Sequence, residues 1–455
     1  MNSSSVLKNN CANGLLDLNE LPPIQDGIKS CRLQRIDTIT QLPKNVDGGS
    51  LEFLVDPSLV ESSCLYQSFF EFKIKVVKLD DNGNEKDLEA TDLVSYINFM
   101  PNTMIRNVSL SIADEELTAA TDVYFPYESY VSALFHLSKA GQNNLLGSGA
   151  GWFLDTPGAF DEIDPRPNDT TGEPLNAGLA ARHNLTADSK VTTFVSPLLH
   201  PLFLVPKLLP TKTDLRIALH LQNTEFCLTA YKPTQAPLPR YLIKVMSSAL
   251  YLQRYRLSPE AQIHQERMLT DGAKYPLQTL HTSTFVIPTG SDGISRPITI
   301  ASAIPSFVYV GFVKKKSFDG AQYLNALRFV DCDLSELYLE LDGEKFPSGL
   351  SFKPNYATKD YALAYKQARS ELNYSVLDLA FDADAWESGY TVYPISLLAD
   401  RSLGCEYISP PEHAKGQLNI NVKFRKDLEE PVVAVVICET SRLLELDSQR
   451  KPKWI

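Results

Sequence analysis

Alternating apolar and polar residues run through most of the chain and predict β-strands. In the segment SFFEFKIKVVK (68–78), four apolar side chains from Phe70 to Val76 alternate with Glu71, Lys73 and Lys75. This period of two places one face of a strand in a core and the other in water. Related patterns predict further strands in the first half of the chain, at residues 50–55, 106–117, 190–195, 214–221 and 243–257.

The same order of patterns returns in the second half of the chain. A strand pattern at 306–315 precedes SELYLELDGEKF (335–346), in which alternating leucines lead into an Asp-Gly hairpin turn. Val108 and Leu337, which belong to corresponding hairpins, lie 229 residues apart. The chain is therefore interpreted as two copies of one module. Two later strands complete the second copy, at residues 418–424 and 432–439.

One helix interrupts each half. In DVYFPYESYVSALFHL (122–137), four apolar side chains recur at i, i+3, i+4 and i+7, namely Tyr127, Tyr130, Val131 and Leu134. Pro126 suits the first helical position, and Glu128 favours the positive N-terminal end of the helix. The counterpart DYALAYKQARSEL (360–372) places Tyr365 at 235 residues after Tyr130. We expect the aromatic face of the first helix to pack on the sandwich of its own module.

About eight short strands per half, joined by turn residues, predict a β-sandwich of the jelly-roll type, in which two antiparallel sheets bury their apolar faces against each other. The predicted fold class is all-β, with two tandem eight-stranded jelly rolls, each with a short helix and loops. We expect an N-terminal arm (1–45), a first jelly roll (46–258) with a long loop (139–187), a second jelly roll (259–446) and a basic C-terminal tail (447–455). The tail is expected to be mobile until a partner buries it.

Composition and charge exclude several functions. The chain has 455 residues, of which 44 % are hydrophobic, and its formal net charge of −12 disfavours direct nucleic-acid binding, because phosphate contacts need clustered Lys and Arg. Seven cysteines without a C-x-x-C pair favour folding in a reducing compartment such as the cytoplasm or nucleus. Neither a signal peptide nor an apolar run long enough to span a membrane is present.

Candidate catalytic and metal-binding residues are few. GSGAG (147–151) lacks the ending of a phosphate loop, and DCD (331–333) and DAD (382–384) are better explained as turns than as metal ligands. Two Cys/His pairs are conceivable nucleophiles, Cys227 with His220 and Cys405 with His413, but no catalytic signature surrounds either pair. All seven histidines are isolated from one another: His136, His183, His200, His220, His264, His281 and His413. We predict neither an enzyme nor a protein with a metal or other cofactor.

The chain resembles the double jelly-roll major capsid proteins of Polinton (Maverick) elements and adintovirus-like viruses, and more distantly those of virophages and the adenovirus hexon. Two segments carry the resemblance most specifically. One is the helix start YFPYESY (124–130) after a hairpin, and the other is SFDGAQYLNALRF (317–329), which resembles the family's G-x-x-x-x-N-P-F segment. Ala326 stands where that pattern has Pro, so the turn there is expected to differ.

The resemblance implies a virion protein that forms homotrimers of pseudo-hexagonal outline, and these trimers tile an icosahedral shell. The implied partners are neighbouring capsid trimers, penton and minor capsid proteins and an internal membrane. The basic tail supplies the candidate assembly contacts, which are Arg450, Lys451, Lys453 and Trp454. Two alternatives stay open: a β-sandwich virion surface protein that binds a receptor or carbohydrate, and a cupin-like metalloenzyme, which would need clustered histidines.

Overall fold

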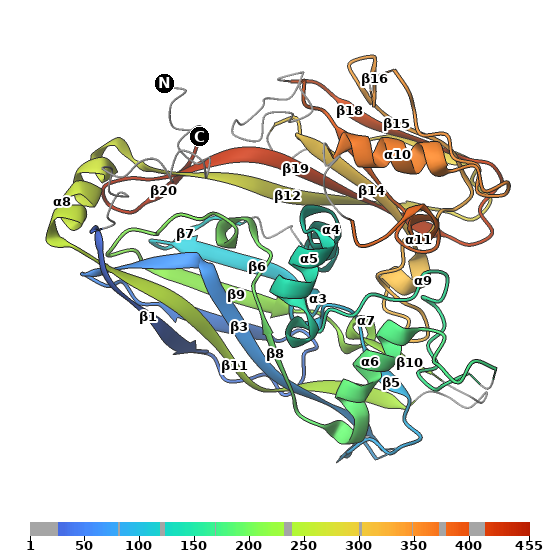
Figure 1. The fold of residues 1–455 in the computed structure, drawn as a ribbon, viewed down its shortest axis with the longest axis horizontal. Helices are drawn as coiled ribbons and strands as arrows, with labels where there is room; N and C mark the ends of the chain where they lie inside the picture. The colour runs from blue at the N-terminus through green and yellow to red at the C-terminus, as the bar shows by residue number, and fades with distance from the viewer. Residues whose placement is uncertain are drawn as a thin grey trace, which may run out of the picture.

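The computed structural model describes residues 26–80, 82–118, 123–168, 170–231, 239–299, 303–347, 349–372, 379–399 and 415–455. Within these residues the strands form two β-sandwiches that lie side by side, as Figure 1 shows. Each sandwich consists of one sheet with long strands and one sheet with shorter strands. We call the two sandwiches the first and second jelly rolls, in chain order. In each of them we call the two sheets the long-strand sheet and the short-strand sheet.

The first jelly roll is built from residues in the first 257 positions. Its long-strand sheet has the order β1 (Ile28–Asp37), β11 (Arg240–Leu257), β3 (Glu61–Leu79) and β8 (Thr192–Ser196), and β4 (Glu85–Lys86) also pairs with β3. Its short-strand sheet has the order β2 (Ser50–Val55), β9 (Leu215–Leu221), β6 (Ile105–Ile112) and β7 (Glu115–Glu116). Outside both sheets, β5 (Val94–Tyr96) pairs with β10 (Leu228–Ala230).

The second jelly roll repeats this topology strand for strand. Its long-strand sheet has the order β12 (Ala273–Ile287), β19 (Val432–Leu446), β14 (Phe307–Lys314) and β17 (Val392–Ser396), and β20 (Pro452–Trp454) also pairs with β19. Its short-strand sheet has the order β13 (Gly293–Pro297), β18 (Leu418–Phe424), β15 (Leu334–Leu341) and β16 (Glu344–Phe346). All pairings between these named strands are antiparallel, and the predicted all-β fold of two jelly rolls is confirmed.

Helices connect and cover the sheets. Three of them carry the argument below: α4 (Phe125–His136), α8 (Pro259–Met268), which joins the two jelly rolls, and α10 (Ala362–Glu371). The loop predicted at 139–187 contains α5 (Lys139–Gly141) and ends in α6 (Ala177–Thr186). Short helices complete the chain at α3 (Met100–Thr103), α7 (Thr224–Cys227), α9 (Lys315–Phe318) and α11 (Ala383–Glu387).

Aromatic side chains fill both sandwiches. In the first, Phe53 of β2 meets Phe70 of β3 edge to face, with ring centroids 5.3 Å apart. In the second, Phe312 of β14 meets Phe424 of β18 in the same way at 5.7 Å. These contacts are the interdigitation that two packed sheets require, and they follow from the alternating patterns of the sequence.

Two long strands were missed by the sequence analysis. Residues 28–37 were expected to belong to an extended arm. They instead form β1, and nearly all of β1 pairs with the C-terminal half of β11. β12 is an edge strand that contains Pro276, a residue that sheets accept only where no ladder bond is lost. Neither strand alternates between buried and exposed residues along its length, so the period of two is missing from their sequences. The predicted domain limits themselves stay a prediction.

Candidate functional site

Helix α4 lies between the two jelly rolls (Figure 1). Eleven of its twelve residues are buried, so it has no solvent-facing side. The expectation that its aromatic face packs on its own sandwich is therefore wrong in part: Tyr127 belongs to the first jelly roll but contacts the second. Its hydroxyl donates to the backbone oxygen of Ala326 at 3.0 Å, and its ring stacks on Phe318 with centroids 5.6 Å apart.

This contact joins the two segments that carry the family resemblance. Tyr127 belongs to YFPYESY, and both Phe318 and Ala326 belong to SFDGAQYLNALRF. Gly311 of β14 allows the second segment to lie close to the sheet, because a Cβ there would stand 2.5 Å from the ring of Phe329. The two motifs thus form one interface, although nearly 200 residues separate them in the chain.

Polar side chains of α4 also reach the outer face of the second long-strand sheet. Thr282 of β12 donates its hydroxyl hydrogen bond to Oε1 of Glu128 at 2.7 Å, and both residues are buried. Two residues further along β12, the hydroxyl of Thr284 is 3.0 Å from that of Tyr124. A buried carboxylate needs such partners, so these contacts fix the position of the helix along the sheet.

The C-terminal end of α4 carries a titratable cluster. His136 Nε2 lies 2.8 Å from the hydroxyl of Tyr309 on β14 and 3.3 Å from a carboxylate oxygen of Glu439 on β19. Burial lowers the pKa of His136, but the Glu439 carboxylate outweighs it, so the pKa lies above the ordinary value of 6.5. Phe135 packs beside this cluster, with its ring tilted by 41° against Tyr309 and in edge contact with Phe381.

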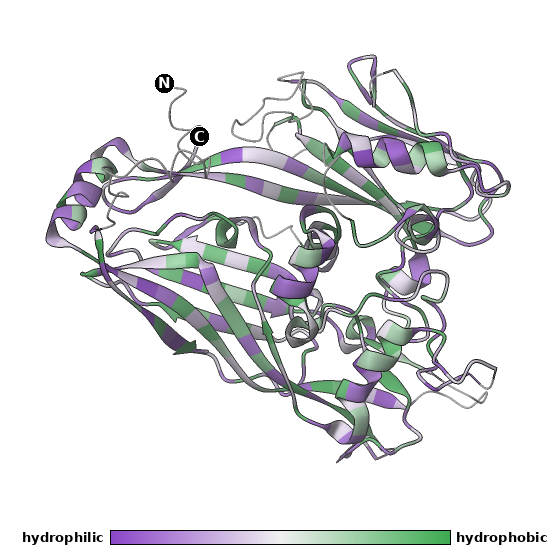
Figure 2. Cartoon of the chain, viewed as in Figure 1, coloured by the Kyte–Doolittle hydropathy of each residue, from purple (hydrophilic) through white to green (hydrophobic). Residues whose placement is uncertain are grey.

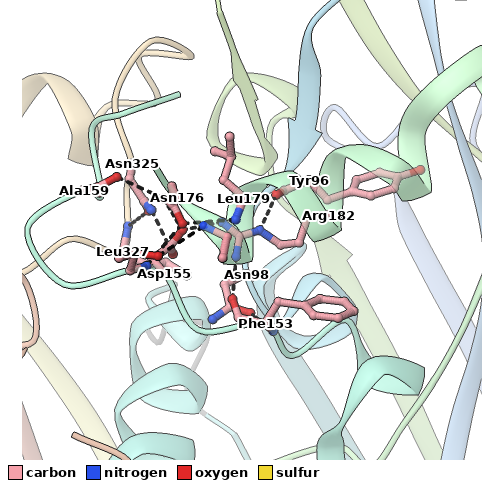
Figure 3. A network of polar contacts seen from close by, with 12 residues as sticks. Tyr96, Asn98, Phe153, Asp155, Ala159, Asn176, Leu179, Arg182, Asn325 and Leu327 are labelled. Carbon is pink, nitrogen blue, oxygen red and sulfur yellow. Dashed lines mark hydrogen bonds and ion pairs between the residues drawn. The ribbon is translucent and has the colours of Figure 1, made fainter. Parts of the chain in front are cut away.

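The long loop 139–187 supplies a second contact between the jelly rolls. Figure 3 shows Arg182 of α6 inserted between loop segments, where it donates to Oδ1 of Asp155 at 2.6 Å and to the backbone oxygen of Tyr96 at 2.9 Å. The other oxygen of Asp155 accepts from the side-chain amide of Asn325, in the second jelly roll, at 3.1 Å. The side chains of Arg182 and Asp155 are 1 % and 0 % exposed, so each depends on the other for charge compensation.

Sequence reasoning did not identify this network. The loop shows no periodicity, and its Gly, Pro and Asp content predicts an exposed segment. The sequence signal for order in this loop was the helix-capping residue Asn176. Its side-chain oxygen caps α6 by accepting from the backbone N–H of Leu179, and its side-chain amide donates to Asp155 at 2.8 Å. The loop is held by these contacts against both jelly rolls.

The C-terminal tail is bound to its own chain. β20 pairs with the end of β19, with Trp454 opposite Leu444, so the expectation of a mobile tail is wrong. Arg450 is buried, donating to Glu266 at 2.6 Å and to the backbone oxygen of Thr211 at 3.1 Å. The guanidinium of Arg442 lies 4.1 Å from the centre of the Trp454 ring. Of the four candidate assembly residues, Lys451 and Lys453 are exposed.

The candidate catalytic residues do not assemble in the described part of the chain. There, no three His, Cys, Asp or Glu side chains lie close enough to hold a metal ion. Asp382 caps α11 through the backbone N–H of Ala385, and Asp331 similarly accepts from the N–H of Asp333. Burial raises the pKa of the Cys227 thiol, which disfavours a nucleophile there. Cys405 and His413 lie outside the described residues.

A shallow groove lies beside α8, near the C-terminal tail. It encloses about 510 Å³ and is lined by Leu59, Lys212, Ile263 and Glu266, among others. Leu59 and Ile263 are 74 % and 55 % exposed. Among the described residues, no helix has the length and apolar character needed to cross a membrane.

The fold is similar to those of solved viral structures, although no similar sequence was found. No family model matches the sequence, and a search of curated proteins found no match. Among solved structures, a chain in the cryo-EM structure of the Sputnik virophage superposes with a TM-score of 0.64 at 11 % identity, over 97 % of this chain and 91 % of that chain. The Faustovirus major capsid protein gives a TM-score of 0.58 at 9 % identity, over 98 % and 94 % of the two chains. The mavirus major capsid protein gives a TM-score of 0.52 at 12 % identity, over 96 % of this chain and 92 % of that chain.

The fold is the double jelly roll of viral major capsid proteins. The likeness extends over nearly the whole length of each chain, so both jelly rolls and the order in which they follow each other are shared. At these identities the likeness concerns the backbone. The particular expectation of a Polinton or adintovirus origin stays a prediction.

Proposed function

We propose that this chain is a major capsid protein whose homotrimers, pseudo-hexagonal in outline, tile an icosahedral virion shell. The observation that carries the proposal is the repetition of one eight-strand topology twice in the chain. This arrangement superposes on at least nine-tenths of a chain of the Sputnik virophage and of the Faustovirus and mavirus major capsid proteins. Two similar lobes per chain give six per trimer, which suits a lattice position with six neighbours.

The buried contacts between the jelly rolls support this role. A shell subunit has to hold its two lobes at a fixed angle, since each lobe contacts a different neighbour. Helix α4 and the Asp155–Arg182 network fix that angle with contacts that are buried on both sides.

The partners proposed with this function are neighbouring trimers, penton and minor capsid proteins and an internal membrane, and the proposed location is the virion. The exposed Lys451 and Lys453 remain the candidate assembly contacts of the tail, alongside Arg450 and Trp454, which already have partners within the chain. That the chain is not an enzyme, and that it folds in a reducing compartment of the host cell, stay predictions.

Purified protein provides the test. We expect light scattering after size-exclusion chromatography to give about three times 50.7 kDa, and electron microscopy of the same fraction to show pseudo-hexagonal particles. A stable monomer that binds a glycan or receptor would overturn the proposal in favour of the virion surface protein considered above.

A further inference from the structure

Helix α8 lies at one end of the molecule, where it joins the two jelly rolls (Figure 1). None of its ten residues is buried. A helix of this length is marginal in water by itself, and in proteins it usually owes its stability to an apolar side that packs on a neighbour. The hydroxyl of Ser258 caps the first turn by accepting from the backbone N–H of Ala261, but the side chains of α8 are half-buried or exposed. α8 therefore offers a side on which a further segment can pack.

The groove of about 510 Å³ runs along one side of this helix. Five of its lining residues belong to α8 and follow the i, i+3, i+4, i+7 and i+8 spacing of a single helix face, namely Pro259, Gln262, Ile263, Glu266 and Arg267. Leu59, in the loop between β2 and β3, and Lys212, which precedes β9, contribute to the rest of the lining. The exposed side chains of Leu59 and Ile263 give the groove an apolar surface.

The charged side chains of the groove have a positive excess. Glu266 already has two cationic partners, the ammonium group of Lys212 at 3.0 Å and the guanidinium of Arg450 at 2.6 Å. Arg267 adds a further positive charge to the lining. A segment that complements the groove therefore needs apolar side chains for Leu59 and Ile263 and carboxylates for the surrounding cations.

The N-terminal segment of the same chain has this composition and joins the described residues beside the groove. GLLDLNELPPI (14–24) contains four leucines, one isoleucine and two carboxylates, and no basic residue. It lies outside the described residues, but the chain that follows it does not. The backbone oxygen of Gly27 accepts from the N–H of Ser258 at 2.8 Å, and Ser258 directly precedes Pro259 of the groove. Nine residues separate Leu18 from Gly27, and an extended chain of that length spans about 30 Å, twice the length of α8.

We propose that residues 15–21 bind in the groove beside α8 of the same chain, with their leucines against Leu59 and Ile263. Asp17 and Glu20 then lie near the cations of the groove. The contact supplies α8 with the apolar neighbour that the described residues do not provide. It also holds the start of β1, an edge strand whose first six residues are exposed, against the segment that joins the two jelly rolls. The proposal concerns a single chain and does not depend on the proposed trimer.

A disulfide cross-link tests the contact in the full chain. The background is C11S/C31S/C405S, because the remaining cysteines are buried or half-buried. L18C with I263C should form a disulfide on mild oxidation, and the product should keep the mass of one chain on a non-reducing gel. L18C with M268C is the matched control, since Met268 is as exposed as Ile263 on the same helix, at 58 % against 55 %, but does not line the groove. Both pairs are tethered alike, so faster linkage of the first pair reports the docking itself. Equal rates, or linkage into dimers, would overturn the proposal.

Thiol labelling tests the same contact without a covalent trap. In the same background, I263C should react with a maleimide about tenfold more slowly when Leu18 is present than in the L18D variant, because burying one leucine side chain corresponds to a factor of about that size. M268C should react at one rate in both. Labelling of I263C that is equally fast with and without L18D would overturn the docking. So would protection of I263C that requires added vesicles of anionic lipid, because a membrane surface would then be the occupant of the groove. Each of these outcomes leaves the mass of the assembled particle, and with it the capsid function, to be judged separately.

Discussion

The outer faces of the two long-strand sheets have the same topology and opposite environments. In the second jelly roll, all of β17 and the first nine residues of β19 are buried, on both faces of the sheet. In the first, residues 68–76 of β3 alternate between buried and half-buried, and β8 alternates between buried and exposed residues. Figure 2 shows the resulting alternation of apolar and polar residues in the first sheet. Helix α4 contributes to the difference through its contacts with β12, β14 and β19, and Glu371 of α10 contacts β17 at Ser396.

This difference separates a face that is covered within the chain from one that is open. The covered face forms when the chain folds, so it can be continuously apolar, as VVAVVICE in β19 is. The open face of SFFEFKIKVVK carries Glu71, Lys73 and Lys75 and can remain in water. Two copies of one module thus have different surface chemistry, because only one of the two faces is covered within the chain.

A charge placed on the covered face tests this distinction most strongly. Ile437 of β19 is 2 % exposed and stands between Thr282 and Tyr309, both of which contact α4. I437K would bury an unpaired ammonium group, and we expect a loss of about 4 kcal/mol or more in the free energy of unfolding. K73I makes the reverse change on the open face and should stay within about 0.5 kcal/mol of wild type. Urea unfolding followed by tryptophan fluorescence measures both.

Equal stability of I437K and K73I would contradict the difference between the covered and the open sheet face. Because K73I also enlarges the apolar area of the open face, its unfolding has to be measured at a protein concentration at which the chain is monomeric. A large loss for K73I would mean that the face of β3 is already covered within the chain.

The two helices provide the next test. F135A on α4 removes a ring that lies against Tyr309 and Phe381, and we expect it to cost about 3–5 kcal/mol, as large-to-small changes in a core do. S370A is its counterpart on α10 and changes an exposed residue, so we expect a change below about 0.5 kcal/mol. Equal losses in thermal and urea unfolding would show that α10 is buried in the free chain.

Most of the fold could be predicted because alternation is a local signal. The strands around Phe70, Leu110 and Leu339 show it, and the Asp-Gly turn marks a hairpin in the second half. β1 and β12 could not be found in this way, since their burial does not alternate along their length. The offset between Tyr130 and Tyr365 revealed the duplication, and the structure bears it out strand by strand.

The interface between the jelly rolls was not predictable by the same means. Periodicity shows that one side of α4 is apolar, but it does not say which sandwich that side meets. The partners of Tyr127 and Asp155 lie about 200 and 170 residues away in the chain, and no local pattern links them. Continuous burial in β14 and β19 was visible as long apolar runs, and this was the signal that a second layer covers the sheet.

In the C-terminal tail, the two candidate assembly residues Arg450 and Lys451 lie in different environments. R450A removes a buried guanidinium that bonds to Glu266 and to the backbone of Thr211, and we expect it to cost about 1.5–3 kcal/mol. K451A changes the adjacent exposed lysine and should be neutral within about 0.5 kcal/mol in the free chain. If K451A alone weakened particle assembly in a reconstitution assay, Lys451 would be an assembly contact and Arg450 a residue that anchors the tail. Equal effects on unfolding would contradict the intrachain role of Arg450.

The smallest expected effect is a pH dependence of the covered interface. The pKa of His136 is raised above 6.5, so the folded chain holds this proton more tightly than the unfolded chain does. The resulting stabilisation is fully present below pH 6.5 and is lost as the pH rises through the folded pKa, at about 1.4 kcal/mol for each unit of pKa difference. The difference in unfolding free energy between wild type and H136Q should therefore shrink as the pH is raised from about 5.5 to 8.5. H264Q changes an exposed histidine of α8 and should leave the profile unchanged. If the difference in unfolding free energy between wild type and H136Q instead grew with pH, burial would outweigh the Glu439 carboxylate in setting the pKa of His136. No charged pair would then join α4 to β19.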